Sequence, residues 1–202
     1  MTGYPLVDAA MRQLWAIGWM PNYMRHVVAG FLIEYLNLSW THGEKWFHDT
    51  LVDADVAINS YMWQNGGHSG MDQWNFVMHP VFAAKTCDPE GDYVRRWVPE
   101  LAGLPKEYVH CPWEAGHGLL AKLGVVLGEL PRGSADDDQR LVGCTYPGRV
   151  VKDLEHARRV SHAAVMAVRR SKAGRERILE GSGHEWLPLE VAAAAPPPPQ
   201  GG

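Results

Sequence analysis

The sequence predicts an all-α fold, and three observations lead to this expectation. Apolar residues recur at helical spacing in one segment after another, and glycine or proline separates these segments. No segment shows a convincing alternation of apolar and polar residues, which is the pattern of a half-buried strand. The 202 residues are 46% hydrophobic, so the chain has ample apolar material for a core.

The first two helices follow from apolar residues on one face and from clear end signals. Apolar residues continue at helical spacing up to Ile17, and Gly18 is expected to end this helix. A second helix is expected over residues 22–36, with Asn22 as its N-cap. Its buried face should carry Met24, Val27, Val28, Phe31, Leu32 and Tyr35.

The middle of the chain is expected to hold shorter helices. Residues 44–52 indicate a third helix, and residues 55–65 indicate a turn into a fourth, which the pair Gly66-Gly67 breaks before a polar loop. From Asp88 onward the sequence indicates a turn, a short helix and a Gly/Pro stop.

The last part of the chain changes character. Residues 116–127 form an apolar segment, 129–143 a polar loop, and 150–171 a final helix. One face of that helix should carry Val151, Leu154, Ala157, Val160, Ala164 and Val168. The run AAAAPPPPQGG at the end cannot pack a core, so we expect one domain over residues 1–171 and a disordered tail over 172–202.

Charge and cysteine content limit the cellular environment that we expect for the protein, but they do not identify a binding partner. The net charge is −4, yet residues 149–177 hold nine Lys/Arg against three Asp/Glu, so the rest of the chain sums to about −10. The three cysteines have no CxxC spacing, which favours reduced thiols over a disulfide framework. No signal peptide and no apolar stretch of membrane-spanning length is present, so we expect an intracellular, soluble protein.

Several stretches together resemble the photolyase/cryptochrome family. They are TGYPLVDAAMRQLWAIGW at 2–19, the element N-x-x-R at 22–25, WFHDTLVDADVAINSYMWQ at 46–64, and DPEGDYVRRWVPEL at 88–101 followed by LP and HCPW. They occur in the family's order and near its spacing, across about residues 2–115. The resemblance implies the second half of a helical FAD-binding domain. Its antenna domain and earlier helices would precede residue 1, so this chain resembles one half of an FAD pocket.

The resemblance also assigns cofactor-binding residues. It places Arg25, Asp53 and Asp55 beside the flavin ring, with Arg25 and Asp53 as a buried ion pair. A guanidinium suits a carboxylate, and its charge favours a reduced, anionic flavin. Without the resemblance, a helix-capping aspartate and a surface arginine are the alternative. The resemblance further places Trp19 near the adenine and Asn22 beside the substrate cavity.

Three more residues are assigned to the photochemistry. Asn59 corresponds to the position that faces flavin N5, where plant cryptochromes have Asp, so it looks more like photolyases and some animal-type relatives. A turn Asn is the alternative. Trp63 and Trp40 match the inner and middle tryptophans of the family's electron-transfer chain, and core packing is the alternative for both. The outer tryptophan of that chain would precede residue 1.

The lesion side of the site matches the family only in part. Six-four photolyases have two histidines four residues apart, of which this chain keeps the second, His26, and has Asn22 in place of the first. His26 follows Arg25 directly, as a histidine does in six-four photolyases, and is either an acid that acts on a lesion or a structural histidine. Repair of cyclobutane dimers uses a second tryptophan two residues after the inner one, where this chain has Asn65. Trp74 or His68 is a candidate to replace that aromatic wall.

Different classes of function remain open at this point. A complete protein would absorb blue light through FAD, take electrons through tryptophans, and act either in DNA repair as a deoxyribodipyrimidine photo-lyase or in light sensing. Its partners would be damaged DNA or signalling proteins. A non-catalytic relative that does not hold FAD by itself is the alternative. A metal site of His42, His48, Asp49, Asp53 and Asp55 is disfavoured, because no tight ligand spacing supports it.

Overall fold

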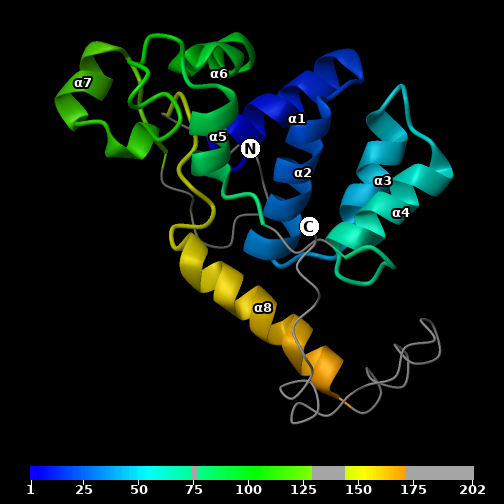
Figure 1. Ribbon diagram of the computed structural model, residues 1–202. Helices are drawn as coiled ribbons and strands as arrows, with labels where there is room; N and C mark the ends of the chain where they lie inside the picture. Colours follow the sequence, from blue (N-terminus) through cyan, green and yellow to red (C-terminus); the bar gives the residue numbers. More distant parts are fainter. Residues whose placement is uncertain (74–76, 129–143, 172–202) are drawn as a thin grey trace, which may run out of the picture. The chain divides into compact units, whose positions relative to one another are not determined.

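A computed structural model describes residues 1–73, 77–128 and 144–171, and the regular elements in these residues are helices (Figure 1). In this part of the chain the sole β-type pairing is the isolated bridge between Leu127 and Tyr146, so the all-α prediction is confirmed. The predicted loop at 129–143 and the predicted tail at 172–202 lie outside the described residues. The chain divides into two compact units, residues 1–161 and 162–202, and the last helix runs across their boundary.

The first helix, α1, spans Pro5–Ile17 and ends as predicted. Pro5 occupies its first turn, where a missing N–H costs nothing. Gly18 adopts the left-handed conformation with φ of 69° and donates its N–H to the Leu14 carbonyl at 2.8 Å. The Val52 N–H then donates to the Gly18 carbonyl at 2.8 Å, which ties the end of α1 to the connection that follows α3.

The second helix differs from the prediction at both ends. Helix α2 spans Asn22–Gly30 and continues as a π-helical segment, η1, over Phe31–Tyr35. The prediction of Asn22 as the N-cap is wrong. Pro21 is the extended cap residue, and its carbonyl accepts the Arg25 N–H at 3.1 Å, so Asn22 is already helical. The expected buried face is confirmed except at Leu32, which is partly buried.

Helices α3 and α4 form a neighbouring pair (Figure 1). Helix α3 spans Trp40–Thr50, so it begins earlier than the predicted residue 44, because Ser39 caps it and accepts the Thr41 N–H. Helix α4 spans Val56–Gly66 and stops where the two glycines predicted a break.

Shorter helices complete the first unit. Helix α5, Pro80–Cys87, was not predicted, although Pro80 at its start and the apolar positions after it are a helix signal. The predicted short helix after Asp88 is α6, Asp92–Trp97. Two 3₁₀ turns follow, η2 at Pro99–Leu101 and η3 at Pro112–Glu114, and then α7 at His117–Lys122. None of the described helices is both long enough and apolar enough to cross a membrane.

The final helix, α8, spans Leu154–Arg170 and starts later than the predicted residue 150. Asp153 explains the start, because its carboxylate accepts the His156 N–H at 2.8 Å as a helix cap does. Val151 therefore lies before the helix. Leu154 and Ala157 pack against the core, whereas Val160 is exposed.

A buried carboxylate holds the amino-terminal residues against the segment before α8. Asp8 on α1 accepts hydrogen bonds from the Thr2 N–H at 2.6 Å, the Gly3 N–H at 3.0 Å and the Tyr146 hydroxyl at 2.6 Å. The Tyr4 hydroxyl donates to the Val151 carbonyl at 2.6 Å in the same region. The two contacts made by the tyrosine hydroxyls join residues more than 130 positions apart, so the first residues and residues 146–151 are parts of one core.

The stability of the fold should decrease at acidic pH because three histidines are partly or fully buried. Burial lowers the pKa of His26, His79 and His110 below the ordinary value of 6.5. As pH falls below about 6.5, the unfolded chain therefore binds protons that the folded chain refuses, and stability declines. We expect a lower free energy of unfolding at about pH 5.5 than at about pH 7.5 in urea denaturation.

A variant of His79 provides the control for this pH dependence. Its Nδ1 caps α5 by accepting the Val81 and Phe82 N–H groups, both at 3.3 Å, which requires an unprotonated Nδ1. Asparagine is a good cap that does not titrate. His79→Asn should therefore reduce the loss of stability between the two pH values, and an unchanged or larger loss would contradict the assignment.

Candidate functional site

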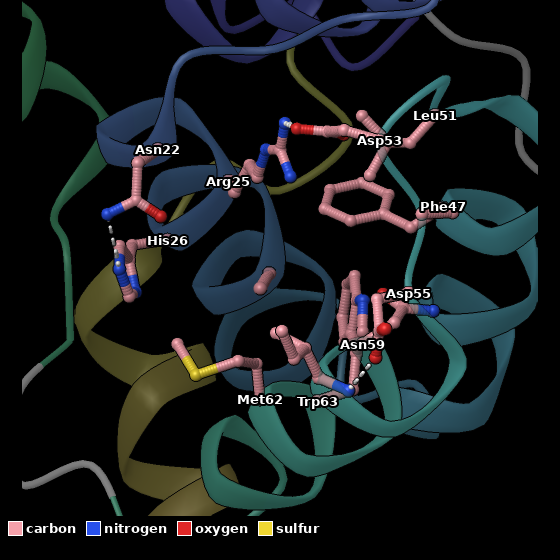
Figure 2. Close-up of a pocket in the computed structure, with 13 residues that line it drawn as sticks. Asn22, Arg25, His26, Phe47, Leu51, Asp53, Asp55, Asn59, Met62 and Trp63 are labelled. Atoms are coloured by element: carbon pink, nitrogen blue, oxygen red, sulfur yellow. Dashed lines mark hydrogen bonds and ion pairs between the residues drawn. The ribbon is translucent and has the colours of Figure 1, made fainter.

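A pocket of about 330 Å³ opens between α2, the end of α3 and the start of α4 (Figure 2). It brings together the predicted residues Asn22, Arg25, His26, Asp53, Asp55, Asn59 and Trp63. Its remaining wall was not predicted and consists of Ala29, Phe47, Leu51, Ala54, Ile58 and Met62. Figure 2 shows the α2 residues on one side and Phe47, Asp55 and Asn59 on the other.

Arg25 and Asp53 form the predicted ion pair across the mouth of this pocket. One terminal nitrogen of Arg25, Nη2, lies 3.0 and 2.8 Å from the two carboxylate oxygens, and Nε donates to the Met20 carbonyl at 2.8 Å. The expectation that the pair is buried is wrong. The two side chains are 25% and 47% exposed, because this side of the pocket is open to solvent.

Asp55 has a structural role as well as a place in the wall. Its carboxylate accepts the Ile58 N–H at 2.8 Å and so caps α4. The alternative of a helix-capping aspartate is therefore correct for this residue, and it does not exclude contact with a ligand. The cap fixes the first turn of α4, which carries Asn59.

Asn59 is oriented by a neighbouring backbone group. Its Nδ2 donates to the Glu44 carbonyl at 2.9 Å. Because a carbonyl only accepts, the amide nitrogen must be on that side, and Oδ1 remains as the acceptor of this side chain at the pocket wall. Beyond Asn59 lies a second pocket of about 170 Å³, lined by Glu44, Lys45, His48, Val56, Asn59 and Ser60.

Trp63 and Trp40 lie along the contact between α3 and α4. The Trp63 ring is almost fully buried and meets Phe47 edge to face, with ring centroids 5.0 Å apart. It packs on Gly43 of α3, while the Trp40 ring packs on Gly67 just after α4. The two glycines, which have no Cβ, leave room for the two rings at this contact. Trp40 does not line the pocket.

Replacing Gly43 by alanine should disturb the inner tryptophan. A Cβ at this position would lie 2.1 Å from Cη2 of Trp63, so the ring or the helix must move. We expect Gly43→Ala to lower the free energy of unfolding by about 1–3 kcal/mol and to change the environment of Trp63. Urea denaturation followed by tryptophan fluorescence measures the first effect.

Gly118→Ala is the matched control, because a Cβ there meets nothing within 4 Å in α7. It should leave stability unchanged or raise it slightly through helix propensity. Equal stability of the Gly43→Ala and Gly118→Ala variants would contradict the close packing of Trp63 on α3.

His26 and Asn22 line the α2 side of the pocket together. The Asn22 Nδ2 lies 3.5 Å from Nε2 of His26, one turn further along the helix. Burial lowers the pKa of His26, so its imidazole is mainly neutral near pH 7 in this structure. A neutral imidazole accepts or relays a proton more readily than it donates one.

The remaining predicted residues lie elsewhere. Trp19 is 43% exposed and does not line the pocket. Asn65 is buried and its Oδ1 accepts the Asp72 N–H at 3.2 Å, so it shapes the loop after α4 and is not part of the pocket wall. His68 contacts Glu34, and Trp74 lies outside the described residues.

Among residues 1–73, 77–128 and 144–171, no three His, Cys, Asp or Glu side chains gather as metal ligands would.

The apolar residues of the pocket wall could not be predicted from the sequence. Phe47 and Met62 follow ordinary helical spacing, and a residue that faces a ligand pocket has the same pattern as one that faces a core. Their closeness in sequence to Asp53, Asp55 and Asn59 was the one signal that could have marked them.

Comparisons with known proteins agree with this geometry. Residues 1–167 match the family described as the FAD binding domain of DNA photolyase. A deoxyribodipyrimidine photo-lyase of Agrobacterium fabrum is 46% identical over 85% of this chain and 33% of its own length. Cryptochrome-1 of Arabidopsis thaliana is 36% identical over 92% of this chain and 25% of its own length.

Solved structures show the same similarity. A bacterial class III photolyase from Agrobacterium tumefaciens superposes with a TM-score of 0.70 at 45% identity, covering 83% of this chain and 32% of that one. A Synechocystis cryptochrome gives 0.69 at 33% identity, covering 80% and 30%. The chain thus spans about a third or less of the length of these relatives. Residues 1–167 match the family's FAD-binding domain, so the cofactor is FAD. The chain therefore belongs to the photolyase/cryptochrome family.

Proposed function

We propose that this chain forms one wall of the FAD site of a blue-light-dependent flavoprotein that repairs ultraviolet-damaged DNA. The observation that carries the proposal is Asn59, whose amide nitrogen is held by the Glu44 carbonyl, so that its Oδ1 is the acceptor at the pocket wall. The resemblance assigns this position to flavin N5, and a protonated N5 needs such an acceptor. The domain proposed for this role is residues 1–171.

The pocket suits the ring end of FAD. Its volume of about 330 Å³ is near the lower end for ligand pockets, which fits part of a dinucleotide better than all of it. Phe47, Leu51 and Trp63 offer apolar surface to a flat ring, and Arg25 and Asn59 offer one cation and one acceptor to its polar edge. When bound, FAD would supply blue-light absorption and electron transfer. We propose Trp19, Asn22, Arg25, Asp53, Asp55 and Asn59 as the residues that contact it.

Arg25 and Asp53 would set the charge of the site. The positive guanidinium beside the ring stabilises negative charge there, and Asp53 holds the guanidinium in place through both carboxylate oxygens. Because both side chains are partly exposed here, the pair is screened by water. A ligand that covers the pocket would exclude this water and strengthen the electrostatic effect of Arg25.

Trp63 and Trp40 would carry electrons toward the pocket. Trp63 lines it, and Trp40 lies at the same contact between α3 and α4. Close, rigidly packed indole rings are suitable for successive electron transfers, and the glycines at 43 and 67 allow this packing. The role of both residues in photoreduction is part of the proposal.

His26 and Asn22 would face the damaged base. His26 acts as an acid only when it is protonated, and burial lowers its pKa. A phosphate or another anion at the mouth of the pocket would raise that pKa again and make the imidazolium available. Asn65 is not placed to stack on a base, so this side of the site would rely on Asn22, His26 and Met62.

Light sensing is the second candidate, because a plant cryptochrome is 36% identical over 92% of this chain. In that case the partners would be signalling proteins and residues 172–202 would be the responsive tail. Illumination of the purified, FAD-loaded protein with an oligonucleotide that contains a cyclobutane dimer separates the two. Loss of the dimer only under blue light supports repair, whereas an unchanged dimer with a light-altered flavin spectrum supports sensing. A protein that cannot be loaded with FAD would support a non-catalytic role.

Replacing Asn59 by aspartate tests the residue that carries the proposal. A carboxylic acid can supply a proton that the amide cannot, so Asn59→Asp should promote protonation of N5 after photoreduction. The absorbance spectrum recorded after illumination reports this change. Asn37→Asp, at an exposed position that does not line the pocket, is the matched control and should keep the wild-type spectrum. Identical spectra for Asn59→Asp and wild type would refute the role assigned to Asn59.

A further inference from the structure

A buried carboxylate outside the pocket joins parts of the chain that are far apart in sequence. Glu34 is the one charged residue in the apolar run FLIEY of η1, and it is only 5% exposed. One of its oxygens accepts a hydrogen bond from Nε2 of His68, and the other accepts from the Ser161 hydroxyl at 2.9 Å. Both partners are also shielded, since Ser161 is 3% exposed and the His68 side chain is 17% exposed.

Each partner comes from a different element. His68 lies in the loop directly after α4, and its backbone has a positive φ of 57°, a conformation that costs energy for a non-glycine residue. Ser161 lies in α8 and is the one fully buried residue described in that helix. The contact with Glu34 therefore stabilises both an unfavourable loop conformation and the position of the first half of α8, up to Ser161, within the first unit.

The two hydrogen bonds should depend on each other. A carboxylate is expensive to bury unless its oxygens are paired, and here the cost is shared between two donors. Burial by itself raises the pKa of Glu34, but the hydrogen bonds from His68 and Ser161 outweigh it and hold this pKa below its ordinary value. If either donor is lost, the carboxylate gains by turning toward water, and the other contact breaks as well.

We propose that Glu34, His68 and Ser161 form a latch that couples the carboxyl-terminal end of α4 to α8. This Glu34 latch is intact only when both contacts are made, so the loop after α4 and the first half of α8 open together. It goes beyond the proposed function, because it needs neither FAD nor light. Its relevance to the pocket is that α4 also carries Asn59 and Trp63, and His68 follows Trp63 by little more than one turn.

The π-helical segment supports this interpretation. A π turn inserts an extra residue into the helical register and is commonly found at functional positions. In η1 the Leu36 N–H donates to the Phe31 carbonyl at 3.1 Å, and the segment places Glu34 toward the loop and α8 while Phe31 and Tyr35 stay in the core. The positive charge of Arg158, one turn before Ser161, also favours the ionised form of Glu34.

Hydrogen exchange of backbone amides in the whole protein tests the latch. Glu34→Gln should speed exchange by at least about tenfold both in residues 158–161 and in residues 67–72, because hydrogen bonds to a charged group are lost in both places. The decisive variants are His68→Ala and Ser161→Ala. His68→Ala should speed exchange in α8, and Ser161→Ala should speed exchange in the loop.

Glu155→Gln is the control, since this exposed carboxylate of α8 pairs with Arg159 at 3.4 Å. It should leave both segments at the wild-type exchange rate. Faster exchange confined to α8 in Ser161→Ala and to the loop in His68→Ala would show two independent contacts and would overturn the latch. Unchanged exchange in Glu34→Gln, His68→Ala and Ser161→Ala would overturn it as well.

Discussion

Replacing Asp8 by alanine is expected to lower the free energy of unfolding by about 3–5 kcal/mol. The change removes the acceptor shared by the Thr2 and Gly3 N–H groups and the Tyr146 hydroxyl, and leaves these donors unsatisfied in a buried place. It should also release the first residues and the segment around Val150 together, because the Val150 N–H donates to the Thr2 carbonyl at 2.9 Å beside this carboxylate. Urea denaturation measures the loss.

A graded pair of variants controls this prediction. Tyr146→Phe removes one of the donors and should cost about 1–2 kcal/mol, clearly less than Asp8→Ala. Asp92→Ala removes a carboxylate that is 87% exposed and 3.7 Å from Arg95, and should change stability by at most about 0.5 kcal/mol. If Asp8→Ala were no more destabilising than Asp92→Ala, the buried carboxylate would not organise the core as described.

Replacing Arg25 by alanine is expected to weaken FAD binding by at least about tenfold. The variant loses the cation beside the proposed ring site and leaves the Asp53 carboxylate unpaired, so that a negative charge faces a ligand that is itself anionic. Equilibrium titration with FAD measures the affinity. This prediction depends on the proposed function, whereas the Asp8 prediction does not.

Two variants delimit the effect of Arg25. Arg25→Lys keeps the charge but not the planar fork, so its affinity should lie between those of wild type and Arg25→Ala. Arg96→Ala removes an arginine that stacks over Trp97, 5.3 Å from the ring centroid, and does not line the pocket. It should bind FAD like wild type. Equal affinities for Arg25→Ala and Arg96→Ala would exclude Arg25 from the site.

The helix ends that the sequence predicted well are those set by local chemistry. Gly18 ends α1 in the left-handed conformation that glycine adopts at little cost, whereas Gly67, with a φ of −79°, ends α4 in an ordinary conformation and leaves room for the Trp40 ring. The starts of α3 and α8, which were predicted too late and too early, have local causes too. Ser39 and Asp153 are ordinary capping residues, but the predicted starts followed the spacing of apolar residues instead. The element missed altogether, α5, is short, and short helices depend on tertiary packing more than on propensity.

The buried carboxylates were beyond sequence reasoning. Asp8 and Glu34 look like solvent-facing positions of amphipathic helices, and charged residues are rarely buried. Their partners Tyr146 and Ser161 lie more than 120 positions away, and nothing local announces them. For the pocket, the resemblance identified the polar residues. It could not give the exposure of the Arg25 and Asp53 pair, because exposure depends on every segment around the site.

The most direct test of the account is an FAD titration of isotope-labelled protein followed by backbone amide NMR. If the pocket is a wall of the flavin site, saturable shifts should concentrate at Arg25, Asp55 and Asn59, while the amides of α7 at His117–Lys122 stay unchanged. Position-specific shifts detect binding even when the affinity is modest. Shifts that do not saturate, or that spread evenly over the protein and leave the pocket residues unmarked, would contradict the account.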